Sequence, residues 1–257
     1  MMTSKHSLLA TIIAALLWSA SAMAQTSWQL GIGGTRVLDT YLSQEHFSGM
    51  GMTFLSTTER KKADRSWATL IEHEVNIADV KDRSESCQEL QGEYSLYVGS
   101  LRSWQVGHFL LQAGAMGCAN LGFIYNTSNG NNPAQGRLSL HAMPSGAATY
   151  GFRLFRQQLS ARYEVQLPLL GLMFSPNYGQ SYYEIFSQGN YDHNIVPTTF
   201  VSAPNIRQQL SVDWKISHFA RLRIGYLGNY QQSSVNNLKS HVYTHRLMIG
   251  IVRELKD

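Results

Sequence analysis

The sequence predicts an all-β protein: a single antiparallel, up-and-down transmembrane β-barrel of about ten strands after an N-terminal signal peptide. Three observations support this fold class. Apolar and polar residues alternate with a period of two over most of the chain, as in strands with one face in lipid. Short turns alternate with long polar loops between these segments. A short apolar run and a small-residue cleavage pattern near the N-terminus are typical of an exported protein.

The export signal comes first in the chain. Lys5 and His6 precede an apolar run over residues 8–18, and Ala22 and Ala24 supply the small residues of a cleavage site. The run is too short for a membrane helix, which needs about 20 apolar residues. We therefore expect a signal peptide over residues 1–24 and a barrel domain over residues 25–257, located in the bacterial outer membrane.

Composition supports a barrel and excludes other classes. Charged residues make up 15% of the chain and mean hydropathy is −0.20, which excludes a helical membrane protein. A barrel dilutes its apolar residues with polar ones, so these values suit it. The net charge of +4 is small and evenly spread, and we expect no nucleic-acid partner. The 13 Tyr and 5 Trp suit the aromatic girdles of a membrane interface.

The first half of the chain contains the clearest hairpin. Two Gly-rich strands are expected over residues 28–35 and 49–56, and residues 86–100 and 106–123 then alternate in opposite phase. A tight turn between Arg102 and Ser103 would pair polar with polar residues across that hairpin. In that register Cys87 lies opposite Cys118, so we predict a cross-strand disulfide in an oxidising compartment. Free thiols or a redox switch are the alternatives, and we expect no metal or other cofactor.

The second half repeats the pattern. We expect one long strand over residues 137–153 with a kink near Pro144, and shorter strands over 158–167, 209–216, 221–226 and 244–251. Turns at 102–103, 155–157 and 217–219 are short and would face the periplasm. Connections over 37–48, 79–85, 126–135, 175–205 and 232–240 are long and would face outward. The connection over 57–65 is longer than most periplasmic turns, and a soluble periplasmic β-sandwich is the alternative fold.

Charged residues fall on the inward parity, where they predict a lumen charge network. Its acidic members would be Glu72, Glu74, Glu89 and Glu93, and its basic members Arg207, Lys215, Arg221, Arg223 and Arg246. Two close carboxylates could instead share a proton as an acid/base pair. Barrels of about eight strands are filled by their own side chains, so a barrel of this size is not a general porin.

A histidine lies on the outward parity near the outer rim. His245 is in phase with Tyr226, Tyr230 and Ser234, which would place all four on the lipid face. A histidine base could activate a neighbouring serine for attack on an acyl ester. His245 and Ser234 therefore form a candidate catalytic pair of a lipid hydrolase. The competing interpretation is an interfacial aromatic belt that contains a histidine.

The largest outer loop, over residues 175–205, is rich in aromatic side chains. Its candidate ligand-binding residues are Tyr178, Tyr182, Tyr183, Asp192, His193 and Asn194. Aromatic faces with interspersed amides and acids suit the capture of a glycan or a peptide, and long loops often carry function. The alternatives are a self-packed cap over the barrel mouth and an Asp/His protease site.

Three sequence runs resemble a known family. The runs are LDTYLS at 38–43, LPLLGLMFSPNYGQSYYE at 167–184 and NNLKSHVYTHR at 236–246. They are similar to an uncharacterised Bacteroidetes family of exported proteins, the domain-of-unknown-function family DUF3316. The resemblance covers the whole mature chain and implies an outer-membrane-type barrel. The family has no assigned activity, so the resemblance implies no catalytic residue.

These observations favour a non-enzymatic outer-membrane barrel, in contact with outer-membrane lipid, whose outward loops bind a surface glycan or peptide. A hydrolase at the rim, with His245 as base and Ser234 as nucleophile, is the second hypothesis. A narrow pore for a small solute is the third, and a charged lumen disfavours it.

Overall fold

The computed structural model describes residues 22–62, 66–130, 132–155, 157–217 and 219–255. These residues form twelve strands and one short helix. The strands are β1 Ala22–Asp39, β2 Phe47–Lys62, β3 Trp67–Lys81, β4 Gln88–Val106, β5 Phe109–Asn126, β6 Ala134–Leu154, β7 Gln157–Gln166, β8 Leu170–Phe174, β9 Ile195–Thr199, β10 Ile206–Lys215, β11 Ala220–Val235 and β12 Leu238–Leu255. The helix is α2, Tyr182–Phe186.

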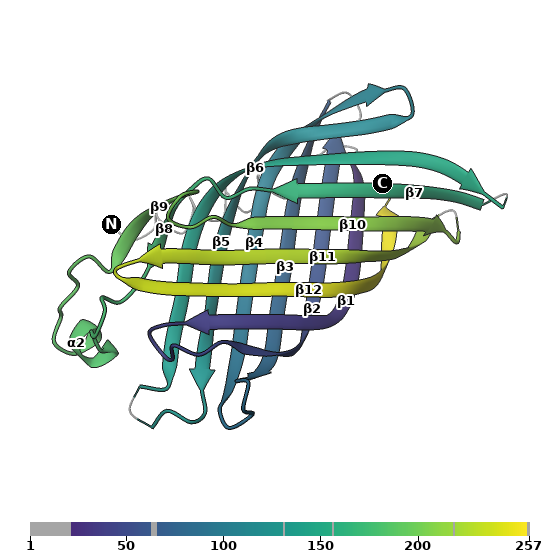
Figure 1. Cartoon of the computed structure of the whole chain (residues 1–257). Coiled ribbons are helices and arrows are strands. Elements are labelled where there is room, and N and C mark those ends of the chain that lie inside the picture. The colour runs from purple at the N-terminus through teal and green to yellow at the C-terminus, as the bar shows by residue number, and fades with distance from the viewer. Residues whose placement is uncertain (1–21, 63–65, 131, 156, 218, 256–257) are drawn as a thin grey trace, which may run out of the picture.

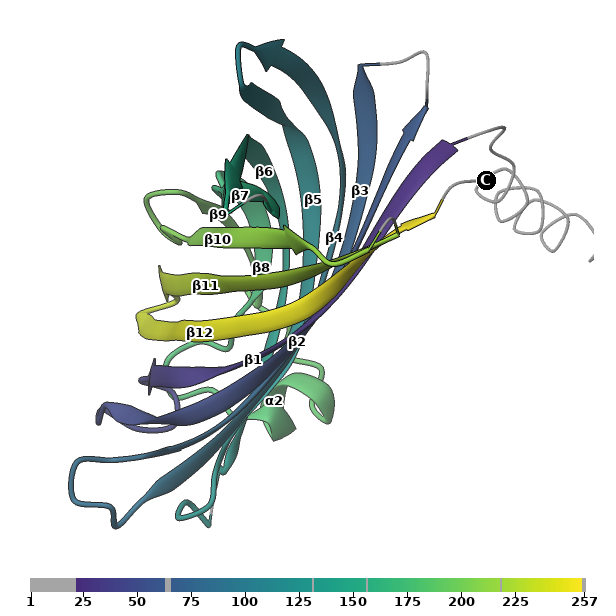
Figure 2. The ribbon, with the colours of Figure 1, turned by 90° about the vertical axis from the view of Figure 1, so that its right-hand side faces the viewer.

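The strands close into a barrel with ten strand positions around its circumference, as the sequence predicts. We call each position a stave, because two of them are built from two consecutive strands each. The sheet runs in the order β5-β4-β3-β2-β1-β12-β11-β10-β7-β6, and pairing of β5 with β6 closes it (Figures 1 and 2). The short strands β8 and β9 are not further staves. β8 pairs with β6 beyond the stretch of β6 that pairs with β7, so β7 and β8 are successive parts of one stave. β9 pairs with β8 just as β10 pairs with β7, so β9 and β10 are successive parts of the next stave.

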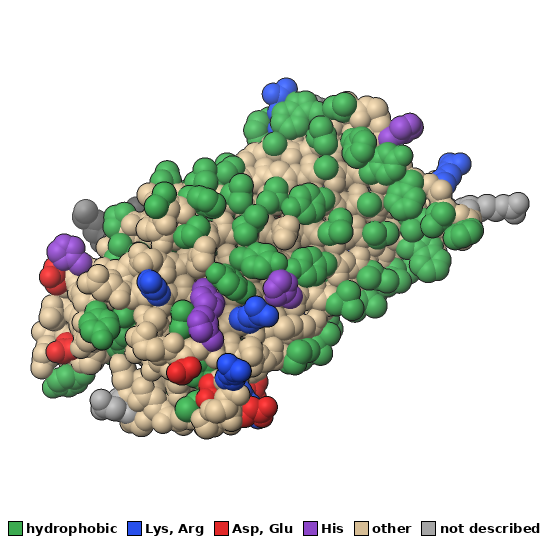
Figure 3. All heavy atoms as spheres, in the orientation of Figure 1, with side chains coloured by type: hydrophobic (Ala, Val, Ile, Leu, Met, Phe, Trp, Pro, Cys, Tyr) green, Lys and Arg blue, Asp and Glu red, His purple; other side chains and the backbone are tan. Residues whose placement is uncertain are grey.

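Because polar and apolar residues alternate along each strand, polar side chains fill the interior of the barrel and apolar side chains cover its outside. In β3, Glu74 and Asn76 point inward and are buried, whereas Val75 and Ile77 point outward and are 40% and 56% exposed. Hydrophobic side chains cover much of the face seen in Figure 3. A polar interior inside an apolar exterior is the arrangement of a transmembrane barrel. None of the described helices is long and apolar enough to cross a membrane.

Two connections differ from the prediction because the strands extend further than expected. β4 continues past Arg102 and Ser103 and turns at Gly107, whose φ is +58°. A positive φ at the first central residue alone fits a type II′ hairpin turn. The predicted loop over 232–240 is a two-residue turn, with φ of +51° at Asn236 and +60° at Asn237, which fits a type I′ turn. β6 is one long strand that continues through Pro144, as predicted.

The two ends of the barrel differ in their connections. Short turns at 107–108 and 216–219 lie at the same end as the paired termini of β1 and β12, where Ala24 faces Leu255. Connections over 40–46, 82–87, 127–133 and 175–194 lie at the other end, which is the outer end by the topology of this class. The predicted signal peptide falls almost wholly on residues 1–21, which lie outside the described residues.

Apolar residues also occur inside the lumen, where they form a plug near the outer end. This outer plug consists of Val37, Leu42, Phe47, Ala78, Val80, Ile124 and Val242. Six of these side chains come from inward positions of strands, and Leu42 comes from the connection between β1 and β2. Their exposed fractions are at most 9%. The outer mouth is therefore filled by side chains of the barrel itself.

Candidate functional site

The middle of the lumen is organised around Arg207 on β10. Its Nε lies 2.8 Å from the Glu74 carboxylate and its Nη1 lies 2.9 Å from the Glu72 carboxylate. The guanidinium also lies 4.5 Å from the centre of the Tyr97 ring and donates to Gln166. All these groups are buried, so the cation compensates two carboxylates that are removed from water.

Further ion pairs line the wall. They are Arg137–Glu93, Arg162–Glu164, Arg223–Asp213 and Arg221–Glu254. Arg137, Arg162, Glu164 and Asp213 were missed as network members, although their parity in the sequence marks them as inward. Within the part of the chain that the structure describes, Arg246 forms no ion pair and donates instead to Thr53, Thr35 and backbone carbonyls. Glu89 accepts a hydrogen bond from Asn126.

The proposed acid/base pair of glutamates is not formed. The β3–β4 register places Glu72 opposite Tyr97, Glu74 opposite Ser95 and Glu93 opposite Asn76. The β3–β4 turn lies between Lys81 and Gln88. This is later in the chain than the turn positions that would bring two glutamates opposite each other. Glu72 and Glu74 instead share Arg207 as their cation, and Glu93 pairs with Arg137.

The predicted disulfide is wrong for the same reason. The extended β4–β5 hairpin pairs Cys118 with Tyr97, and Cys87 lies before β4 in an outer connection. Both cysteines are free. The Cys87 backbone N–H donates to Asp82, and together with the Ser84 hydroxyl it lowers the pKa of that exposed carboxyl. Cys118 donates to Asn120 inside the lumen.

The candidate hydrolase pair is also not brought together. His245 is exposed on the outer face of β12, where its Nδ1 lies 2.7 Å from the Tyr226 hydroxyl and 3.4 Å from that of Tyr230. Gly228 faces His245 across the β11–β12 pair, and Ser234 lies six residues further along β11. At about 3.4 Å per residue, the two side chains are roughly 20 Å apart. The arrangement around His245 is that of an aromatic belt.

The long outer loop forms a folded unit, which we call the outer cap (residues 175–194). α2 begins at Ser181, whose side chain accepts from the Glu184 backbone N–H while the Glu184 carboxylate accepts from the Ser181 backbone N–H. Gln180 bridges the base of the cap, because its Oε1 accepts from Asn194 and its Nε2 donates to the Asn190 carbonyl. Ile185 is the residue of α2 that is fully buried.

The outer cap lies across the mouth of the barrel. The Tyr182 hydroxyl accepts from the backbone N–H of Gly136 on β6 and donates to Gln135, and its ring packs edge-on against Tyr41 in the β1–β2 connection. β6 and β1 lie on opposite sides of the ten-stave ring. Burial raises the pKa of Tyr182, so its hydroxyl stays protonated and can donate. Asn236 in the β11–β12 turn provides a third anchor through the Ser175 carbonyl.

The outward surface of the cap is aromatic and nearly uncharged. Tyr178, Tyr183, Phe186 and Tyr191 are between 62% and 69% exposed. The His193 ring lies against the Asp192 carboxylate, and both side chains are exposed. Of the predicted ligand-binding residues, Tyr178, Tyr183, Asp192 and His193 thus face solvent, whereas Tyr182 and Asn194 hold the cap in place.

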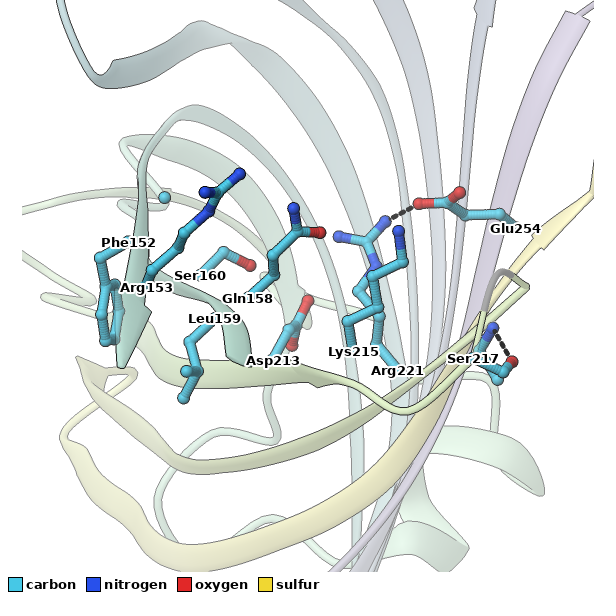
Figure 4. Close-up of a pocket in the computed structure, with 12 residues that line it drawn as sticks. Phe152, Arg153, Gln158, Leu159, Ser160, Asp213, Lys215, Ser217, Arg221 and Glu254 are labelled. Carbon is cyan, nitrogen blue, oxygen red and sulfur yellow. Dashed lines mark hydrogen bonds and ion pairs between the residues drawn. The ribbon is translucent and has the colours of Figure 1, made fainter. Parts of the chain in front are cut away.

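At the opposite end, the lumen opens as a vestibule of about 530 Å³ (Figure 4). Residues from the ends of β6, β7, β10, β11 and β12 line it, among them Arg153, Lys215 and Arg221. A smaller cavity of about 150 Å³ lies deeper and shares Ser160, Asp213 and Arg221 with it. The Arg162–Glu164 and Arg223–Asp213 ion pairs line this second cavity. No group of side chains in the described residues could hold a metal ion.

Comparison with known proteins identifies the family. The sequence profile of the family described as "Protein of unknown function (DUF3316)" matches residues 10–257. The chain therefore belongs to this family, as its sequence runs predict. No curated protein matches the chain.

The chain is also similar to several solved structures. The chain is similar to the transport unit of the autotransporter AIDA-I from Escherichia coli, with a TM-score of 0.45 and 6% identity over 97% of each chain. It is similar to the β domain of the Bordetella autotransporter BrkA, with a TM-score of 0.44, 8% identity and coverage of 92% and 100%. The translocator domain of NalP from Neisseria meningitidis gives a TM-score of 0.41 at 10% identity, with coverage of 98% and 95%. These likenesses are to outer-membrane β-barrels and concern the fold alone.

Proposed function

We propose that this protein resides in the bacterial outer membrane and binds a surface glycan through the aromatic face of its outer cap. One observation carries the proposal. Four aromatic side chains stay exposed on a cap whose other side is fixed by hydrogen bonds to the barrel. Exposed apolar surface on a rigid support is typical of an interaction site.

The chemistry of the cap surface favours a neutral saccharide. Ser187, Gln188 and Asn190 are exposed among the aromatic residues and supply hydroxyl and amide groups that both donate and accept. Aromatic rings stack on the C–H faces of sugars while such groups bond their hydroxyls. The only acid in α2, Glu184, is engaged in the capping box.

The test compares cap variants with a matched variant on the barrel wall. Tyr183→Ala and Tyr191→Ala should each reduce retention on a glycan array by about tenfold or more, because an aromatic anchor contributes on the order of 1–2 kcal/mol. Tyr125→Ala removes an exposed aromatic side chain of β5 and should leave retention unchanged. Folding of each variant is checked by heat-dependent gel mobility.

Two results would contradict the proposal. Retention that survives both cap substitutions would mean that the cap is not the binding surface. Capture of peptides in the absence of any glycan binding would replace the ligand class while keeping the site. Hydrolysis of lipid esters by the wild-type protein would revive the second hypothesis, in which Ser234 would have to act from about 20 Å away from His245.

A further inference from the structure

The inner end of the barrel carries a cationic row that the proposed surface function does not use. β6 pairs Arg153 with Gln158 of β7, and β10 pairs Lys215 with Arg221 of β11. β7 and β10 pair as far as Leu159 and Trp214, so Gln158 lies beside Lys215 one residue further on. Neighbouring strands are about 4.8 Å apart, so the four residues form one row of roughly 14 Å. Figure 4 shows their side chains rising from adjacent strands into the vestibule.

Nearby acids neutralise only Arg221 in this row. Asp213 is held by a bidentate contact with Arg223, at 2.6 and 2.8 Å. Glu254 is paired with Arg221. Within the described residues, Arg153 and Lys215 have no acidic partner. Like charges that lie directly opposite each other, as Lys215 and Arg221 do, destabilise a strand pair unless something compensates them.

The row faces open space of ligand size. The vestibule of about 530 Å³ falls within the range of small-molecule sites. Gly151 lies one position deeper than Arg153 on the same face, and a side chain added there would meet nothing within 4 Å. Ser160 stands opposite Gly151 and adds a hydroxyl group to the wall. The vestibule therefore has cations on its rim and room beneath them.

We propose that the vestibule binds, from the periplasmic side, a small molecule that carries two or more phosphate or carboxylate groups. Arg221 keeps donors beyond its contact with Glu254. Lys215 stands one strand away from it, and Arg153 stands three strands away. Two anionic groups on one ligand can thus be engaged at separate points. Gln158 and Ser160 can donate to its remaining oxygens.

The test uses the full chain in detergent and titrates it with inorganic pyrophosphate in a calorimeter. The wild type should bind, and binding should weaken as salt is raised because the contacts are charge-assisted. The double variant Arg153→Gln/Lys215→Gln should lower the affinity by about tenfold or more. Arg36→Gln is the matched control, because it removes one exposed cation from the outer face of β1. Citrate in place of pyrophosphate separates carboxylate from phosphate ligands.

A second variant tests the location without changing charge. Gly151→Leu should fill part of the vestibule and weaken binding while the cationic row stays intact. Undiminished binding in this variant would place the anion elsewhere and overturn the proposal. So would absence of binding by the wild type for both anions at millimolar concentration, or an equal loss in Arg36→Gln. Heat-dependent mobility again shows that each variant is folded.

Discussion

At the scale of single residues, Arg207 is the side chain on which the middle of the lumen depends. It reaches Glu72 and Glu74 from the opposite side of the barrel and stacks on Tyr97. A buried ion pair contributes little net stability against an apolar replacement, but removal of one partner leaves an uncompensated charge. The three charges therefore have to be changed together if the barrel is to stay stable.

Arg207→Met should accordingly lower the free energy of unfolding by about 3–5 kcal/mol, because two buried carboxylates lose their cation. The triple variant Arg207→Met/Glu72→Gln/Glu74→Gln should recover most of this loss. Urea unfolding in detergent micelles, followed by far-UV circular dichroism, measures both values. A single variant as stable as the wild type would show that water or other donors already compensate Glu72 and Glu74.

For single residues, the sequence predicted correctly which side of the barrel wall a side chain faces, but not which residue it contacts. Alternation along one strand decides which side a side chain faces, and this local rule placed Glu74 and Arg207 inward and His245 outward. Partners depend on the register between strands. A shift by an even number of residues keeps every face matched, so polarity could not distinguish the predicted hairpin from the observed one. Cys87 and Cys118 were therefore paired on a register that the structure does not adopt.

At the scale of elements, turns rather than strands decided where prediction failed. Gly107 supplies the positive φ of the β4–β5 turn. A glycine at this position favours a turn later in the chain than Arg102 and Ser103. Consecutive Asn236 and Asn237 both adopt positive φ, which asparagine tolerates better than most residues. Both turn signals were present in the sequence. The fold of the cap was not readable, because its anchors Tyr41, Gly136 and Asn236 are far apart in the chain.

The capping box of α2 gives the outer cap a pH dependence. Hydrogen bonds from the backbone N–H and hydroxyl of Ser181 lower the pKa of Glu184 below its ordinary value of 4.5. Because the folded-state pKa is lowered, the contribution is fully present above pH 4.5 and is lost as pH falls through the folded-state value. Protection of the α2 amides against hydrogen exchange should therefore decrease below pH 4.5.

Glu184→Gln provides the control for this effect. Glutamine can complete a capping box without titrating, so protection in this variant should not change over the same pH range. The comparison uses protection factors, which remove the intrinsic pH dependence of exchange. Equal pH dependence in the variant and the wild type would assign the effect to a group other than Glu184.

At the scale of the whole molecule, the barrel is closed by three layers in series. The outer cap spans the mouth, the outer plug fills the lumen beneath it, and the ion pairs around Arg207 occupy the middle. Cavities near the outer end measure only about 20 and 30 Å³, which is room for one or two water molecules. The vestibule of about 530 Å³ opens at the inner end. The two proposed sites therefore lie at opposite ends of the barrel, with the outer plug and the ion pairs between them.

This arrangement predicts no conductance, even without the cap. In planar bilayers the wild type should give no steady current, and neither should a variant in which residues 177–192 are replaced by a short Gly-Ser linker. The outer plug explains the second expectation, because Phe47 and Val242 belong to strands that the deletion does not touch. Insertion is verified by protease protection of the barrel in the same membranes. Steady current in the cap variant alone would make the cap the principal barrier, whereas current in the wild type would favour the narrow-pore hypothesis over a closed barrel.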